Sequence, residues 1–461
     1  MSMTLFNENA SAQIHEASLR LLENIGIQLD SETVLRKCRA AGAKNGSAAN
    51  TLRFPPEMIA EALQKTPDTV QLANRQGGSS SVNADSATRY WTTPSMYFWD
   101  EQKGVRREIA QAELANIARV ADRLDSVQAV MGTSITDVPP VHRDFTGVRT
   151  IAENCGKHVR ALCFTPEGMD ALVEMNAVYP GPWLSIGFTA HSPLRWTELA
   201  LRIFERSSGH GIPFTVNGEP LVGVSAPVTL AGSMAVGNAE ILAGITILQL
   251  LEPGRPLIYN LGLARTLDMS TAGAVTGGPE VSLFAKASAA MGRFYNLPSA
   301  SWVSTEAICE DEQAGIEKSL GFLSHSLAGV NVVWGIGQLE ASTTISLPQM
   351  VMDDQMVQHV QRFVRGVDIS EAAFAEDLIA KVGIGGGYLE TEHTLTHFRQ
   401  ELWTPDLLNR EPRESQPPPL PVKARQRVDQ WLAEETAARD SAELQELNRI
   451  EADFRQRIPA G

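Results

Sequence analysis

Polar and aromatic side chains stand at the ends of short apolar segments that the sequence predicts to be buried strands. Asn217 and Glu219 follow one such segment, and Gln338 follows another that contains Trp334. An indole face attracts a cation, and a carboxylate attracts it by its charge. These residue types favour a site for a small cationic molecule. A structural role is the alternative, since Glu219 could hydrogen-bond a loop and Trp334 could fill the protein interior.

Three further candidates depend on helices. Glu280 follows Pro279 at the start of a predicted helix, where the helix dipole favours a carboxylate whatever its function. His393 and His397 are four residues apart, so they share one helix face. No glutamate is placed as in the His-Glu-x-x-His zinc motif, and we therefore predict a structural or substrate role for these histidines and no metal site. The predicted catalytic residues are Glu219, Glu280 and His393, and the predicted substrate-binding residues are Tyr97, Phe188, Asn217, Trp334, Gln338 and Tyr388.

The segments that position these residues alternate between short apolar strands and helices. The apolar runs are continuous, which is typical of strands that are buried on both faces of a parallel sheet. Eight strand–helix units that close on themselves form a TIM (β/α)₈ barrel, whose functional residues lie at the carboxyl ends of the strands. An open doubly wound sheet is the alternative, but no strand is followed by Gly-x-Gly-x-x-Gly. Seven strands are predicted at 127–132, 158–164, 183–188, 213–216, 256–259, 300–303 and 330–334, and the eighth near 381–386.

The chain divides into three regions by composition. Residues 1–108 predict helices, short strands and a hairpin, which we interpret as an N-terminal α+β cap packed on the barrel. Residues 109–410 predict the barrel domain. Residues 411–461 predict a stiff proline-rich linker and a charged helical tail, which docks on the barrel or on a neighbouring subunit. A solvated tail is the alternative.

The composition limits the partners of the chain. The 461 residues carry a net charge of −15 and no cluster of basic residues, which argues against nucleic-acid or anionic-membrane partners. The four cysteines form no Cys-x-x-Cys pair, which argues against a zinc site and a disulfide framework. The N-terminus lacks the pattern of a signal peptide, and the apolar run 241–251 is too short to span a bilayer. We expect a cytoplasmic protein.

Several separated segments resemble the trimethylamine methyltransferase family. The resemblance extends from the N-terminal helix to about residue 410. The segments that carry it are 21–27, 225–240, Thr276-Gly-Gly-Pro-Glu280, 312–317 and 385–397 followed by Trp403-Thr-Pro405. The sequence departs from the family pattern at Cys155–Val159, where members more often have Lys-Pro, and it has its own loop at Phe188–Pro193.

The resemblance implies a reaction. Family members transfer a methyl group from an amine nitrogen to Co(I) of a separate corrinoid protein, and the trimethylamine enzymes carry pyrrolysine. Every position here is a standard amino acid, so the chain resembles the non-pyrrolysine branch, which acts on quaternary amines such as glycine betaine. We therefore expect a methyltransferase, with glycine betaine as the first choice of substrate, cobalamin supplied by the partner protein, no tightly bound cofactor, and a homo-oligomer. The alternatives are a methylated-amine-binding protein without turnover and an unrelated TIM-barrel lyase or hydrolase.

Overall fold

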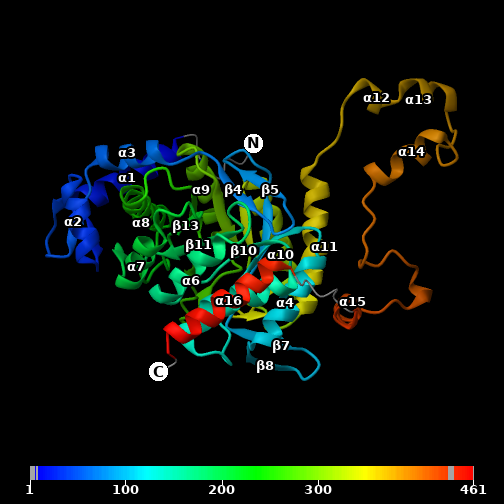
Figure 1. Cartoon of the computed structure of the whole chain (residues 1–461). Coiled ribbons are helices and arrows are strands. Elements are labelled where there is room, and N and C mark those ends of the chain that lie inside the picture. The colour runs from blue at the N-terminus through cyan, green and yellow to red at the C-terminus, as the bar shows by residue number, and fades with distance from the viewer. Residues whose placement is uncertain (1–5, 7–8, 435–440, 460–461) are drawn as a thin grey trace.

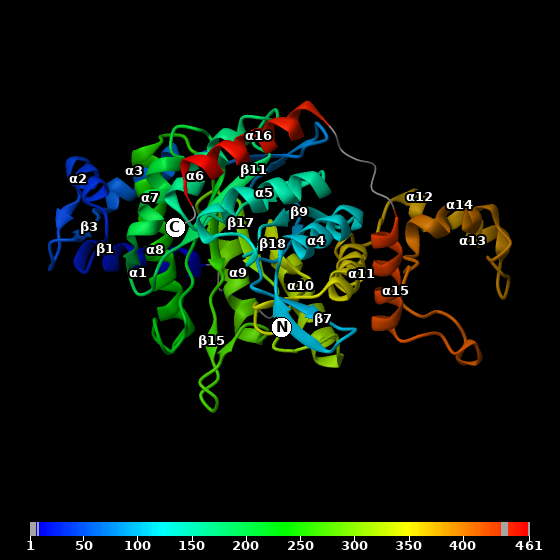
Figure 2. The same cartoon turned by 60° about the horizontal axis from the view of Figure 1, so that its bottom comes forward.

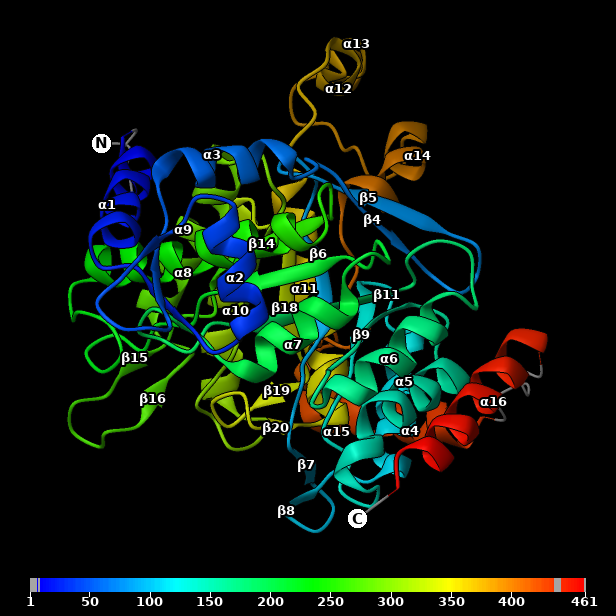
Figure 3. The same ribbon diagram turned by 60° about the vertical axis from the view of Figure 1, so that its left-hand side comes forward.

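The computed structural model describes residues 6, 9–434 and 441–459, and its centre is a closed barrel of eight parallel strands (Figures 1 and 3). The barrel strands are β6 (Arg89–Thr92), β9 (Val127–Met131), β10 (His158–Arg160), β11 (Leu184–Thr189), β13 (Phe214–Asn217), β14 (Leu257–Gly262), β17 (Ser299–Trp302) and β18 (Val332–Ile336). The closed order confirms the predicted TIM-barrel class and excludes the open sheet.

A helix follows each barrel strand along the chain and packs outside the barrel. These helices are α4 (Gln111–Arg123), α5 (Arg143–Asn154), α6 (Pro166–Asn176), α7 (Glu198–Ser207), α8 (Leu230–Leu251), α9 (Pro279–Phe294), α10 (Glu312–Ala328) and α11 (Leu347–Val364). In the described part of the chain, α8 is the one helix long and apolar enough to cross a membrane, and 89% of its apolar window is buried inside the protein. It is therefore a core helix.

The eighth strand lies where the sequence analysis did not expect it. It is β6, within the segment assigned to the cap, and it closes the barrel by pairing with β18 on one side and β9 on the other. The segment near 381–386 instead contains the end of the short helix α13 (Glu376–Val382). Its three glycines carry no side chains that could be buried on two faces, whereas β6 places Tyr90 and Trp91 on opposite faces, both buried. The barrel thus begins at residue 89 rather than 109.

Two apolar clusters correspond to the two faces of the barrel strands. The inner cluster contains every second residue of several strands, including Trp91, Met131, Trp302 and Trp334. The outer cluster joins the opposite faces of the strands to the helices. This alternation follows from strand geometry, because successive side chains point to opposite faces.

The N-terminal region packs against one side and one end of the barrel. Helices α1 (Ala10–Asn24) and α3 (Pro56–Lys65) pack against α8. The helix α2 (Glu32–Ala40) begins after Ser31, whose hydroxyl accepts from the Val34 N–H as an N-cap. The other elements of this region are β1 (Ile27–Leu29), β2 (Lys44–Asn45), β3 (Thr51–Arg53), which form a sheet with β12 (Arg195–Trp196), and the hairpin of β4 (Val70–Ala73) and β5 (Ser79–Val82).

Two further pieces of sheet follow the carboxyl ends of barrel strands and project from the same end of the barrel (Figure 2). The first contains β7 (Tyr97–Asp100) and β8 (Val105–Glu108), which follow β6, together with β19 (Gln338–Leu339) and β20 (Thr344–Ile345), which follow β18. The second is the hairpin of β15 (Thr266–Leu267) and β16 (Ala274–Val275), which follows β14. Both frame the end of the barrel at which TIM-barrel sites lie.

The segment 366–406, which we call the arm, leaves the body of the protein after α11 (Figure 1). It contains α12 (Glu371–Phe374), α13 and α14 (Glu392–Glu401), and none of these helices has a buried residue. The chain returns to the body near Trp403, whose ring contacts His359, and Leu407 is buried. The helix α15 (Leu420–Ala433) then packs against α4 and α11.

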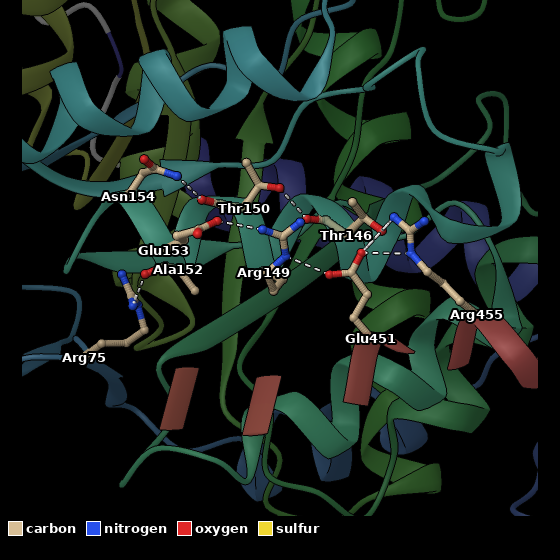
Figure 4. A network of polar contacts seen from close by, with 9 residues as sticks. All are labelled: Arg75, Thr146, Arg149, Thr150, Ala152, Glu153, Asn154, Glu451 and Arg455. Carbon is tan, nitrogen blue, oxygen red and sulfur yellow. Dashed lines mark hydrogen bonds and ion pairs between the residues drawn. The ribbon is translucent and has the colours of Figure 1, made fainter. Parts of the chain in front are cut away.

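The charged tail docks on the barrel through α16 (Ala442–Arg457). Its Glu451 is 6% exposed and accepts from the Thr146 hydroxyl and the Arg149 guanidinium, each at 2.7 Å, while Arg455 adds a second ion pair at 2.8 Å (Figure 4). Burial by itself would raise the pKa of this carboxyl, but Arg149, Thr146 and Arg455 hold it below the usual value. The tail is therefore not merely a solvated helix.

A buried ion pair supports the loop between β18 and β19. Lys318 on α10 and Asp353 on α11 lie 2.8 Å apart, and both side chains are fully buried. The Lys318 ammonium also donates to the carbonyl oxygens of Gly335 and Gln338, each at 2.9 Å. Asp353 accepts from the Gly337 N–H at 2.7 Å. The pair thereby holds both ends of this loop.

The same loop requires glycine at position 335. Its φ is +122°, and a Cβ there would lie 1.9 Å from the Val303 carbonyl oxygen. A side chain is excluded by both the backbone conformation and the close approach of β17. The path of the loop is thus determined by sterics and by the ion pair together.

We predict that Asp353→Ala destabilises the protein by about 3–5 kcal/mol, because it leaves the Lys318 charge buried without a partner. Chemical denaturation followed by circular dichroism measures the loss. The matched control is the double variant Lys318→Met/Asp353→Leu, which removes both charges and should lose less stability. A single variant as stable as the wild type would contradict this prediction.

Candidate active site

Two tryptophans lie side by side inside the carboxyl end of the barrel. Trp302 on β17 and Trp334 on β18 are partners in register, and their side chains are 6% and 4% exposed. Trp91 on β6 stacks on Trp334 with ring centroids 6.4 Å apart and planes inclined by 12°. Neither the Trp302 nor the Trp334 indole N–H has a hydrogen-bond partner among the described residues. The aromatic surface therefore carries two unused donors.

A row of polar side chains crosses three neighbouring strands at the same end. The Asn260 side-chain Nδ2 donates to the side-chain Oδ1 of Asn217 at 3.0 Å, and the Asn217 Nδ2 donates to the Thr189 hydroxyl at 3.3 Å. The Gly262 N–H donates to the Asn260 side-chain oxygen at 3.0 Å, which fixes the orientation of that amide. The row presents oriented amides to the barrel interior.

Glu219 and Arg265 form an ion pair at the rim. Their closest atoms are 2.5 Å apart, and the side chains are 25% and 32% exposed. The Arg265 guanidinium carbon lies 4.9 Å from the centroid of the Trp302 ring. Burial raises the pKa of the Glu219 carboxyl, and Arg265 opposes the rise. Glu219 thus holds a guanidinium over Trp302, and its own charge is already neutralised.

Unpaired polar atoms are concentrated in this part of the barrel. Buried polar groups without a partner are rare in native proteins, and each costs about 1–3 kcal/mol. Gln338 is fully buried, and neither atom of its amide has a partner among the described residues. The other buried atoms without a partner here include Ser95 Oγ, Thr133 Oγ1, Arg160 Nε, Thr215 Oγ1 and the two indole nitrogens. Such a cluster indicates a place where a polar ligand binds.

The structure brings some of the predicted site residues together. Asn217, Glu219, Trp334 and Gln338 all lie at the carboxyl end of the barrel. Tyr97 lies on β7 at the same end, but the Arg106 guanidinium carbon covers its ring at 4.3 Å. These residues come from three separate strand–loop junctions, those after β6, β13 and β18.

Four predicted residues do not join that group. Phe188 points outward from β11 and packs against the outer core, because alternation along the strand turns Gly187 to the interior instead. Glu280 lies in the first turn of α9, in keeping with the helix-dipole alternative. Tyr388 and His393 lie on the arm, away from the barrel (Figure 1). Their predicted convergence with the other residues is wrong for a single chain, because the arm segment forms no barrel strand.

Four further candidates lie at the carboxyl end of the barrel, namely Arg160, Asn260, Arg265 and Trp302. The sequence placed Asn260 after a strand and left cation recognition by Trp302 as the alternative to barrel filling, whereas neither Arg160 nor Arg265 was among the predicted site residues. Arg160 carried a usable signal, since an arginine at the end of a short buried strand requires a partner in the interior. Among the described residues, no group of three or more His, Cys, Asp or Glu side chains is placed to hold a metal ion.

Comparison with known proteins identifies the family of the chain. Residues 1–445 match the family described as trimethylamine methyltransferase (MTTB). The trimethylamine methyltransferase MttB of Desulfitobacterium hafniense is 28% identical over 425 residues, covering 89% of this chain and 84% of that protein. A glycine betaine methyltransferase of Desulfitobacterium hafniense strain Y51 is 28% identical over 419 residues, covering 88% of this chain and 87% of that protein.

Among solved structures, the monomethylamine methyltransferase of Methanosarcina barkeri superposes with a TM-score of 0.57 at 13% identity, over 93% of this chain and 88% of that one. At this identity the likeness shows a shared fold. The match of the family over nearly the whole length of the chain is stronger evidence of relationship than the shared fold, and it confirms the resemblance seen in the separated motifs. The chain belongs to the trimethylamine methyltransferase family.

Proposed function

We propose that this protein transfers a methyl group from a quaternary amine, with glycine betaine as the first choice, to Co(I) of a separate corrinoid protein. The observation that carries the proposal is the pair Trp302 and Trp334 in a barrel interior rich in unpaired polar atoms. Membership of the family supports methyl transfer, and similarity to a glycine betaine methyltransferase supports the substrate. The absence of pyrrolysine from the sequence separates it from the trimethylamine branch.

The chemistry of a quaternary amine suits this set of side chains. Its leaving group is a neutral tertiary amine, so no proton has to be delivered when the carbon–nitrogen bond breaks. Glu219 is engaged by Arg265 and has no need to act as a general acid. The indole of Trp334 would bind the trimethylammonium group by a cation–π interaction. The amide row would orient the molecule with one methyl group toward the open end of the barrel, which is catalysis by proximity.

The methyl acceptor is the corrinoid that a partner protein carries, and it supplies the nucleophile. The partner has to approach the carboxyl end of the barrel, between the β7–β8 hairpin and the β15–β16 hairpin (Figure 2). The proposed roles of this chain are therefore to bind, orient and desolvate the amine. A cytoplasmic location agrees with four cysteines that are all free thiols.

We further infer that the chain forms a homo-oligomer through the arm. Isolated apolar helices of this length are not stable in water, because helices depend on burying one face. The arm nevertheless exposes a series of large apolar side chains. They are Val367, Ile369, Phe374, Ile379, Ile384, Leu389, Leu395 and Leu402, each more than half exposed. A second copy of the chain would cover this surface, and only there could Tyr388 and His393 approach a barrel.

The first test is the reaction itself. Enzyme, glycine betaine and chemically reduced cobalamin should convert the Co(I) absorption spectrum to that of methyl-Co(III), and dimethylglycine should accumulate. Trimethylamine, which lacks the permanent charge, is the control and should give no conversion. Binding of betaine without any conversion, with either free cobalamin or a corrinoid protein, would favour the non-catalytic binding protein. Turnover without corrinoid would favour a lyase or hydrolase.

The second test concerns the cation. Trp334→Ala should weaken glycine betaine binding roughly 5- to 30-fold, which corresponds to about 1–2 kcal/mol for a desolvated cation–π contact. Isothermal titration calorimetry measures the dissociation constant. The control Trp334→Phe keeps a ring and should lose less affinity. Equal affinity of Trp334→Ala and wild type would contradict the assignment.

The third test concerns assembly. Light scattering after size-exclusion chromatography should give the wild type a mass that is a multiple of 50.1 kDa. The triple variant Ile384→Ser/Leu389→Ser/Leu395→Ser should shift the protein toward the monomer, because it removes apolar surface from the arm. Glu390→Ala, on the same segment, should leave the mass unchanged. A monomeric wild type would refute assembly through the arm.

A further inference from the structure

Arg160 is a buried cation without an anionic partner. It points into the barrel from the end of β10 and is 3% exposed. Its Nη1 donates to the carbonyl oxygen of its neighbour Ala161, and its Nε has no partner among the described residues. No Asp or Glu of the described residues lies within ion-pair distance of it. A buried charge without a counter-ion is strongly unfavourable, and this calls for an anion that the chain itself does not supply.

The groups around Arg160 do not neutralise it. His158 lies two residues before Arg160 on the same face of β10, and its ring nitrogens contact the Ala73 carbonyl oxygen and the Ser185 hydroxyl. Burial lowers the pKa of His158 to about 4, so its ring is uncharged at neutral pH. Burial raises the pKa of the Cys163 thiol, which is also uncharged. Burial lowers the pKa of Arg160 to about 9, which still leaves it a cation at neutral pH. The carboxylate of Glu219, at the rim, is paired with Arg265.

The barrel has room for this side chain because β11 has a glycine beside it. A Cβ at Gly187 would lie 2.4 Å from Arg160 Nη2 and 2.4 Å from the Thr215 carbonyl oxygen. Any other residue at position 187 would displace the guanidinium or the neighbouring strand. Gly187 and Arg160 therefore form a built feature of the interior.

Arg160 also lies beside the proposed cation site. Its guanidinium carbon is 5.8 Å from the centroid of the Trp334 ring. In glycine betaine a single carbon joins the trimethylammonium group to the carboxylate, so a molecule with one charge at the indole face has its other charge a few ångströms away. The unpaired Arg160 guanidinium and the Trp334 indole are therefore close enough for the two charged ends of one small zwitterion to reach both groups.

We propose that Arg160 binds the carboxylate of a zwitterionic substrate and so selects N-methylated amino acids over methylated amines that lack a carboxylate. This inference rests on the proposed function and names the group that discriminates among its substrates. A guanidinium binds a carboxylate by charge-assisted hydrogen bonds, which are stronger than neutral ones. An amine without a carboxylate would leave Arg160 unpaired, and a buried polar group left unpaired is the basis of strong discrimination.

The experiment compares two ligands on three proteins. Calorimetric titration of wild type, Arg160→Gln and Arg160→Lys with glycine betaine and with tetramethylammonium separates the carboxylate from the cation. Glycine betaine should bind the wild type best and should lose at least about 30-fold in affinity in Arg160→Gln, the lower end of the loss seen when one partner of a buried charge pair is removed. Arg160→Lys should lose less. Tetramethylammonium should bind all three proteins equally or bind Arg160→Gln better.

A second readout needs no substituted protein. Acetate, which carries only the carboxylate, should compete with glycine betaine for the wild type and should not compete with tetramethylammonium. The inference is overturned if Arg160→Gln weakens both amines alike, if wild type prefers tetramethylammonium, or if acetate does not compete. The calorimetric and competition measurements report binding, so they remain valid even if the protein transfers no methyl group. If the protein does transfer methyl groups, transfer from tetramethylammonium as efficient as from glycine betaine would refute the carboxylate subsite and leave the proposed reaction standing.

Discussion

The parallel pairing of β18 with β6 is the contact that closes the barrel and creates its interior. It joins the last barrel strand to the first and brings Trp334 alongside Trp91. Once the barrel is closed, every second residue of each strand faces a space without bulk water. Apolar residues there pack together, and polar residues must bond to one another or to a ligand. The character of the site follows from which polar residues the strands place on that face.

The electrostatics of the interior are divided between two guanidinium groups. Arg265 is paired with Glu219 and rests over Trp302, so this rim position is neutral as a whole. Arg160 lies deeper and has no carboxylate partner in the part of the chain that the structure describes. One arginine therefore belongs to the structure of the site, and the other remains available for a negative group on the substrate.

Support for the site comes from outside the barrel interior. The Lys318–Asp353 pair lies between two outer helices, yet it holds the loop that carries Gln338. The tail makes a comparable contact elsewhere, where Glu451 of α16 joins α5 through Arg149. The arm is different, because its three helices have no contact that buries a side chain within the same chain. Its exposed apolar side chains are the surface through which we propose that the chain assembles.

The sequence by itself determined the class of fold and much of the chain order of its elements. Seven of the eight strands were predictable because continuous apolar runs between amphipathic helices are a local property, and the Ser31 cap of α2 was predictable for the same reason. Separated motifs indicated the family correctly. At the site, the positions of Asn217, Glu219, Trp334 and Gln338 at the carboxyl end followed from their places near or after the ends of predicted strands.

Only the tertiary structure decided the rest. The sequence predicted a strand at 90–100 but placed it in the cap. The role of β6 arises from pairing with residues some 240 positions away in sequence, a separation evident from the register of Arg89 with Val332. The outward direction of Phe188 depends on which face of β11 meets the helices. The ion pair that neutralises Glu219 and the isolation of Arg160 are properties of neighbours brought together by closure. Local sequence specifies the strand, but only packing specifies what each side chain faces, and here that difference separates the residues that support the site from those that can bind a substrate.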